Sequence, residues 1–188
     1  VRFIGAGVIG VAAIWTLLRI IGPILKGIAS AIAAARARRG GGEGLPLHER
    51  DIPIGIVALV SAGALVPIAI LLAQFVAGGP LPGLTVPLVA VSLVFVLLAG
   101  AFIASVCGYM AGLIGASNSP ISGVGILSIL AAAVLLGIFF APGLGEDGEA
   151  ALVAYALSTT AIVFGIATIS NDNLQDLKTG QLVGATPW

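Results

Sequence analysis

LTVPLVAVSLVFVLLAGAFIASVCGYMAGLI, residues 84–114, contains no Asp, Glu, Lys, Arg or His. It lies inside a longer run of 94 positions, from Ile52 to Gly145, in which no residue is charged. A surface helix of a soluble domain needs a polar face, whereas a helix that crosses a lipid bilayer needs roughly 20 apolar residues. The run is long enough for about three to four crossings, so it predicts a polytopic membrane protein.

The composition of the whole chain agrees with this prediction. Hydrophobic residues make up 59% of the chain and charged residues 9%, where a soluble domain has about 25% charged residues. The net charge of zero gives no reason to expect nucleic acid as a partner. The single cysteine, Cys107, excludes a disulfide framework, and no Cys/His spacing indicates a metal site. We therefore expect neither a cofactor nor a bound metal, and lipid as the surrounding solvent.

Five apolar segments are long enough to span a membrane, so the expected fold is an all-α transmembrane bundle. Pro23 predicts a kink or an exit at the end of the first span, and residues 26–35 then continue as an interfacial helix. The third span is long for one straight crossing, which predicts a tilt or a break near Gly108. The five predicted spans are Phe3–Leu25, Ile54–Ala77, Leu84–Ile114, Val124–Phe140 and Ala150–Ile169.

Lys and Arg in short loops predict the orientation of the bundle, because these residues favour the cytoplasmic side. The 36–53 loop contains Arg36, Arg38, Arg39 and Arg50 and is therefore predicted to be cytoplasmic. The turn at 78–83 and the acidic loop at 142–149, which lack Lys and Arg, are then outside. The 115–123 segment and the polar tail 170–188 are expected on the inside, the tail in the cytoplasm or near a gate.

A polar segment, Gly115–Gly123, separates two apolar spans without containing a charge. Pro120 lacks an amide proton, and the residue before a proline avoids helical dihedrals. In a bilayer such backbone is tolerated only where it is buried in protein or lines a cavity. The segment is interpreted as a broken or re-entrant helix, although an ordinary cytoplasmic turn has the same composition. The candidate substrate-pathway residues are Ser117, Asn118, Ser119, Pro120, Ser122 and Gly123.

A second polar segment follows the last apolar span directly. If this segment is helical, Asp172 and Asp176 are one turn apart and Lys178 can pair with either. Carboxylates and amides at the edge of a span can relay protons or bind a cation, and by composition the same segment also suits a solvated cytoplasmic loop. The candidate coupling or gate residues are Asn171, Asp172, Asn173, Gln175, Asp176, Lys178, Thr179 and Gly180.

Three further patterns are assigned to packing or anchoring. Gly5–Gly10 matches G-x-G-x-x-G, but no acidic residue follows about 20 positions later and the sequel is an apolar helix, which argues against dinucleotide binding. Small residues at four-residue spacing, Ala104, Gly108 and Gly112, predict a close helix–helix contact. His48–Asp51 before the second span is interpreted as a charged interfacial anchor rather than a metal site.

At these two polar segments the chain resembles the oligopeptide transporter (OPT) family, in particular its bacterial members and the related yellow stripe-like metal-chelate transporters. The resemblance rests on GLIGASNSPISG at 112–123 and SNDNLQDLKTGQLVGATPW at 170–188. It implies secondary active transport of small oligopeptides or peptide-like metal chelates, with protons as the coupling ion. It also implies that 118–123 and 171–180 border the pathway or its gate, and that the chain is an internal part of a longer bacterial inner-membrane protein.

Other functions remain open from the sequence. A channel or passive pore subunit would use the 115–123 segment as a filter, but no repeated filter motif or gating-charge series is present. A membrane scaffold that transports nothing has no distinguishing residue pattern. An enzyme is not expected, because the single His48 lies in a predicted loop and no base accompanies the serines of the charge-free run.

Overall fold

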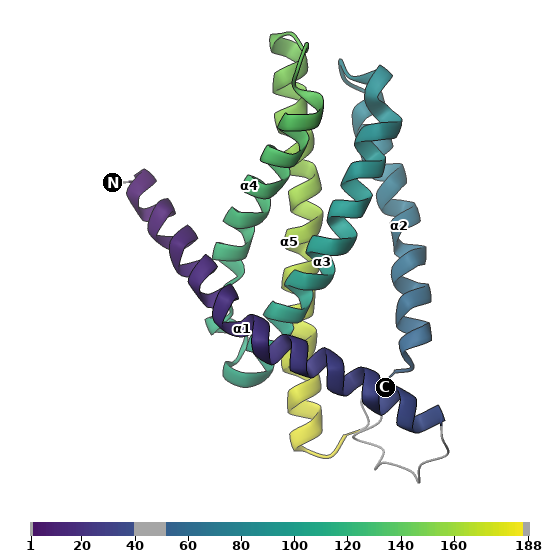
Figure 1. The fold of residues 1–188 in the computed structure, drawn as a ribbon, viewed down its shortest axis with the longest axis vertical. Helices are drawn as coiled ribbons and strands as arrows, with labels where there is room; N and C mark the ends of the chain where they lie inside the picture. Colours follow the sequence, from purple (N-terminus) through teal and green to yellow (C-terminus); the bar gives the residue numbers. More distant parts are fainter. Residues whose placement is uncertain (1, 40–51, 186–188) are drawn as a thin grey trace.

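The computed structural model describes residues 2–39 and 52–185, and within them it is all-helical, as predicted (Figure 1). Five helices are long and apolar enough to cross a membrane. Short 3₁₀ helices, Pro82–Leu84 and Ala116–Asn118, lie in two of the connections. The five long helices are α1 (Arg2–Arg39), α2 (Ile54–Ala77), α3 (Thr85–Ile114), α4 (Ile121–Phe140) and α5 (Glu146–Leu182).

Helix α5 is the central element of the bundle. It packs against α3 along most of its length and against α4, while α2 packs on α3 and α1 crosses α4 (Figure 1). One buried cluster joins α2, α3, α4 and α5 around Leu72, Leu88 and Tyr155. A second joins α3, α4 and α5 around Val96, Val124 and Val163. The antiparallel helices α3 and α4 diverge from their connection, and α5 lies between them (Figure 1).

Helix α5 is longer at both ends than the predicted span Ala150–Ile169, so both predicted ends were wrong. Glu146, Asp147 and Glu149 open the helix instead of forming a loop, because negative side chains stabilise the positive end of the helix dipole. Beyond Ile169 the helix continues to Leu182 instead of ending as a polar tail. The segment 170–179 contains neither Gly nor Pro to interrupt the backbone, and the chain turns only near Gly184, where φ is 73°.

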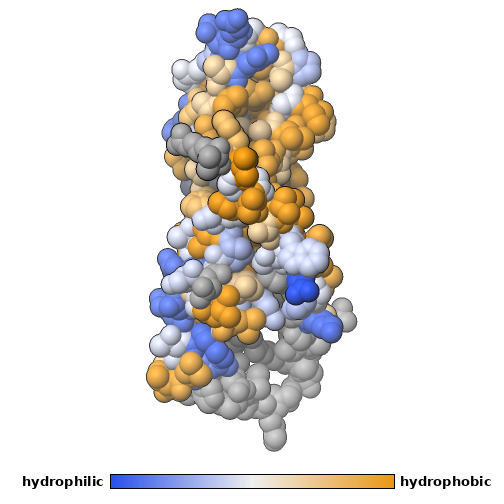
Figure 2. Space-filling view, turned by 90° about the vertical axis from the view of Figure 1, so that its left-hand side faces the viewer, coloured by the Kyte–Doolittle hydropathy of each residue, from blue (hydrophilic) through white to orange (hydrophobic). Residues whose placement is uncertain are grey.

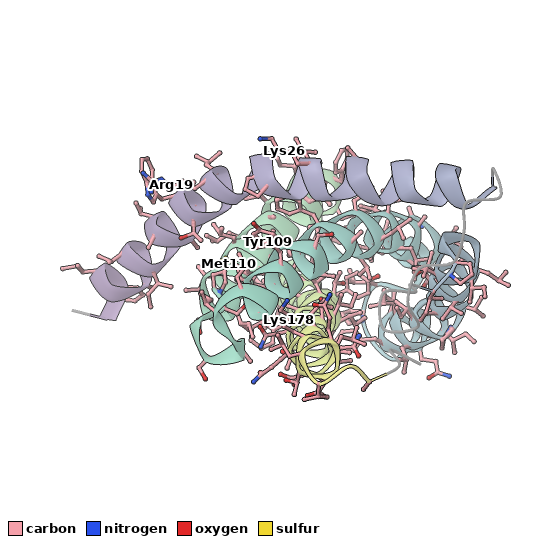
Figure 3. All side chains as sticks on the ribbon, turned by 90° about the horizontal axis from the view of Figure 1, so that it is seen from below. Arg19, Lys26, Tyr109, Met110 and Lys178 are labelled. Carbon is pink, nitrogen blue, oxygen red and sulfur yellow. The ribbon has the colours of Figure 1, made fainter. Side chains whose placement is uncertain are left out.

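Two long helices show how proline and glycine act inside spans. Helix α3 is one continuous helix through Gly108, so the alternative of a break there was wrong. Helix α1 is also continuous, with Pro23 inside it, and it bends between the arm that carries Arg19 and the arm that begins near Lys26 (Figure 3). The second arm crosses the lower part of the bundle in Figure 1, above the projecting end of α5.

On the face shown in Figure 2, hydrophobic side chains cover much of the middle, whereas hydrophilic ones gather at the upper end and over the lower part. This distribution suits a protein whose middle faces lipid. The 78–84 and 141–145 connections share the upper end, and the 115–120 connection lies at the opposite end (Figure 1). The predicted anchor His48–Asp51 and most of the 36–53 loop lie outside the described residues.

Candidate functional site

The two polar segments singled out in the sequence meet at the 115–120 end of the bundle. Asn171 of α5 is only 2% exposed, and its Nδ2 donates a hydrogen bond to the backbone oxygen of Ala116 at 3.4 Å. The two residues are 55 positions apart in the sequence. This contact fixes the α3–α4 connection against α5, and the last part of α5 extends beyond it (Figure 1).

The local backbone explains why the chain turns here. Gly115 has a φ of 84°, a conformation that glycine adopts without steric cost, and its N–H donates to Ala111 O at 3.0 Å at the end of α3. The 3₁₀ turn follows, closed by a 3.2 Å bond from Ser119 N to Ala116 O. Pro120 then precedes α4, where its missing N–H costs nothing because the first helical turn has no partner for it.

A second contact is made by Ser170, the residue directly before Asn171 on α5. Ser170 Oγ donates to Ala104 O of α3 at 2.7 Å. At the same place the missing side chain of Gly108 leaves room for α5, because a Cβ there would lie 2.9 Å from Ser170 Oγ and 3.0 Å from Leu174 Cγ. Gly112, the third member of the small-residue pattern, has no atom within 4 Å of its Cβ position among the described residues.

The predicted pathway residues have different environments. Ser117 and Ser122 are exposed, and Ser119 is half-buried. Gly123 is buried in the contact between α4 and α1, directly against Ala13. Pro120 is half-buried at the start of α4, and Asn118 closes the 3₁₀ turn. The 115–123 segment therefore has one side in a helix contact and another open to the surroundings.

Two polar atoms at this junction are buried without a hydrogen-bond partner among the described residues. They are Asn171 Oδ1 and Ser119 Oγ, and the Ser119 side chain lies beside Cys107 of α3. An amide oxygen is an acceptor only, while a hydroxyl is both donor and acceptor. The junction can therefore accept a hydrogen bond from an N–H or O–H group and donate one in return.

The rest of the predicted coupling or gate segment forms the projecting end of α5. Asp172, Asn173, Gln175 and Asp176 are exposed, so the described residues do not remove either carboxylate from solvent. Lys178 Nζ donates to Gln181 Oε1 at 2.9 Å and lies at this end of the bundle (Figure 3). Thr179 Oγ1 donates to Gln175 O at 3.0 Å, and Gly180 is half-buried near Ala185.

Sequence reasoning missed a group of polar side chains deep in the bundle. Ser92 of α3 and Tyr155 and Thr159 of α5 are all fully buried, and the Tyr155 side chain lies beside both hydroxyls. Ser92 and Tyr155 are isolated polar residues in apolar segments, and Thr159 lies in the short hydroxyl run 158–160. The sequence could place only Tyr155 and Thr159 together, because they are one helical turn apart, and it gave no signal that Ser92 of α3 lies beside them.

Metal binding is not supported by the residues that the structure describes. Among residues 2–39 and 52–185 no group of three or more His, Cys, Asp or Glu side chains is placed to hold a metal ion. What the site offers instead is amide and hydroxyl groups at the connection between two membrane-spanning helices. In membrane proteins, polar groups at such interruptions mark the paths of substrates and ions.

The five long apolar helices define a multi-pass membrane protein. The profile of the OPT oligopeptide transporter protein family matches residues 1–188, and the chain belongs to this family. A Haemophilus influenzae protein named "Putative oligopeptide transporter" is 46% identical over 196 residues, a match that covers 100% of this chain and 30% of that protein. The chain thus spans about a third of the length of this relative. No solved structure matches this chain.

Proposed function

We propose that this chain forms part of a secondary active transporter that carries small oligopeptides or peptide-like metal chelates together with protons. The junction between Asn171 and the 115–120 connection carries this proposal. It supplies a buried amide oxygen and a hydroxyl without partners, at a point where a helix interruption frees the backbone from regular pairing. Family membership and the name of the Haemophilus relative support the same substrate class.

The polar atoms of the junction suit a peptide substrate. A peptide presents an N–H donor and a C=O acceptor at every non-proline residue, and these match the Asn171 Oδ1 acceptor and the Ser119 hydroxyl. Inside a membrane, a polar group without a partner cannot form a hydrogen bond to bulk water instead. A substrate that completes these bonds is therefore favoured over an apolar solute of the same size.

Proton coupling needs a carboxyl group whose charge depends on the transport state. Asp172 directly follows the buried Asn171, and Asp176 lies one turn further along the projecting end of α5. Removal from water raises the pKa of a carboxyl group, so a carboxylate that becomes shielded takes up a proton. We assign the coupling role to Asp172, which becomes shielded when the junction closes around substrate, since it lies next to the buried part of the helix.

Asp172→Asn is expected to abolish stimulation of peptide uptake by a proton gradient, because an amide cannot bind and release the proton. The measurement is initial uptake of a labelled tripeptide by proteoliposomes that contain the full-length protein, with and without an inward proton gradient. Asp176→Asn is the matched control, one helical turn away and also exposed, and is expected to keep the stimulation. Unchanged stimulation in Asp172→Asn would remove this residue from the coupling mechanism.

A further inference from the structure

One side of helix α1 changes from apolar to cationic along its length. The residues of this side recur at spacings of three, four and seven positions, which keeps them on one face of an α-helix. The apolar members are all more than half exposed, from 62% for Trp15 to 73% for Ile4, so no described helix covers them. We call this face the α1 stripe, and it consists of Ile4, Val8, Val11, Trp15, Arg19 and Lys26.

The apolar part of the α1 stripe borders an open groove of about 620 Å³. Gly7 leaves room in this groove because it has no side chain, and no described atom lies within 4 Å of its Cβ position. From Ile4 to Trp15 the helix rises by about 17 Å, close to the roughly 15 Å of hydrocarbon in one leaflet of a bilayer. The groove therefore has the length and the apolar lining that suit an acyl chain. Its lining residues are Ile4, Gly7, Val8, Val11, Ala12 and Trp15.

The cationic part of the α1 stripe begins directly after the groove. The Arg19 guanidinium lies over the ring of Trp15, 5.2 Å from the ring centroid. Stacking on an aromatic face leaves the N–H groups at the edge of the guanidinium free for a bidentate contact, which a phosphate group accepts. Arg19 and Lys26 both lie on the side of α1 that faces away from the other helices (Figure 3). A ligand that approaches from the lipid can therefore reach their donors.

The helices that pack against α1 do not neutralise its positive charge. Six of the eight Lys and Arg residues of the chain are on α1, which contains no Asp or Glu. The neighbouring helices α3 and α4 contain no charged residue, and the described carboxylates all lie on α5. A further apolar helix would cover the groove but leave both cations of the stripe without a partner. An anionic group at the end of an acyl chain satisfies both parts.

The position of Arg19 suits the headgroup region of a bilayer. Ala13 contacts Gly123 in the first turn of α4, and α1 continues toward the lower end of the bundle before it bends (Figure 1). Arg19 is therefore near the level at which the apolar helix α4 begins. Trp is enriched at membrane–water interfaces, and a long Arg side chain reaches the interface from the end of a span.

We propose that the α1 stripe binds one anionic phospholipid, with an acyl chain in the groove beside Gly7 and the phosphate on Arg19 and Lys26. The lipid would hold the first arm of α1, whose contact with the described bundle is mainly to α4. The site does not include the Asn171 junction and does not depend on the proposed transport function, so it can be tested separately.

Lipid titration of the delipidated full-length protein, followed by native mass spectrometry, tests the headgroup part of the site. The probes are phosphatidylglycerol and phosphatidylcholine with the same acyl chains, and the wild type is expected to bind phosphatidylglycerol more tightly. Arg19→Gln is expected to weaken phosphatidylglycerol binding about fivefold, the effect of one cation near an anionic headgroup, and to leave phosphatidylcholine binding unchanged. Lys178→Gln is the matched control, because Lys178 is an exposed cation of α5 outside the stripe, and is expected to keep the preference.

The acyl-chain part of the site is tested by filling the groove. Gly7→Leu is expected to weaken binding of both lipids about fourfold or more, the loss of at least one buried methylene contact. Gly5→Leu is the matched control, since Gly5 also has no described atom within 4 Å of its Cβ position but does not line the groove.

Three results would overturn the proposal. Equal affinity of the wild type for the two lipids would show that the cations of the stripe do not select a headgroup. Equal losses in Arg19→Gln and Lys178→Gln would indicate a general effect of positive charge instead of a site. Unchanged lipid binding in Gly7→Leu would show that no acyl chain occupies the groove, as expected if another helix of the longer protein covers it.

Discussion

Asn171→Ala is expected to reduce peptide uptake about tenfold, because one lost hydrogen bond of roughly 1.4 kcal/mol corresponds to a factor of ten. The substitution removes the 3.4 Å bond to Ala116 O and also the buried Oδ1 acceptor. The connection between α3 and α4 then loses its polar contact with α5, and a substrate loses an acceptor. The measurement is the initial uptake rate of a labelled tripeptide in proteoliposomes, normalised to the amount of protein inserted.

Asn173→Ala is the matched control for this prediction. Asn173 has the same side chain, lies two residues further along α5 and is exposed, so it is expected to retain most of the uptake rate. Asn171→Asp adds a useful distinction, because it keeps an acceptor and removes the amide donor to Ala116. Equal uptake rates for Asn171→Ala and the wild type would show that the junction does not take part in transport.

Gly108→Val is expected to lower the stability of the protein by about 2–3 kcal/mol, the cost of overpacking a close contact. Even a Cβ at this position would lie 2.9 Å from Ser170 Oγ and 3.0 Å from Leu174 Cγ. Ser170 cannot move freely, because its Oγ is bonded to Ala104 O at 2.7 Å. Helices α3 and α5 would have to separate beside the junction, which thermal unfolding in detergent would detect as a lower Tm.

Gly112→Val separates this packing effect from the general effect of replacing a helical glycine. Gly112 lies one turn further along α3, with no described atom within 4 Å of its Cβ position. Valine has a slightly better helix propensity than glycine, so this variant is expected to be neutral or weakly stabilising. If both variants destabilise equally, the cost lies in helix α3 itself and not in its contact with α5.

The spans could be predicted from sequence because lipid imposes a simple rule on them. Each must be apolar over roughly 20 residues, and apart from Leu84 the five predicted segments lie within helices long enough to cross. The ends of α5 could not be predicted from hydropathy, since Glu146 and Asp172 are compatible with both helix and loop. Their helical state depends on the dipole at the start of α5 and on the absence of a breaker before Gly180.

The residues of the candidate site could be predicted from the sequence only in part. Breaks in apolar patterning drew attention to Ser119 and Asn171, but not to the contact between Asn171 and the 3₁₀ turn. That contact joins positions far apart in the chain and depends on how α3 and α5 pack. Ser92 and Tyr155 were missed because an isolated hydroxyl in an apolar run usually bonds to its own helix, and only the packed structure shows that these two do not.

The most direct test of the proposed function is uptake by proteoliposomes that contain the full-length wild-type protein. Labelled di- to tetrapeptides and a ferric or nickel chelate are offered with and without an inward proton gradient. Accumulation of one of these solutes above its external concentration, abolished by a protonophore, is the expected result. Equilibration that ignores the gradient would indicate a passive pore and contradict proton-coupled transport, and no uptake of any of these solutes would contradict the substrate class.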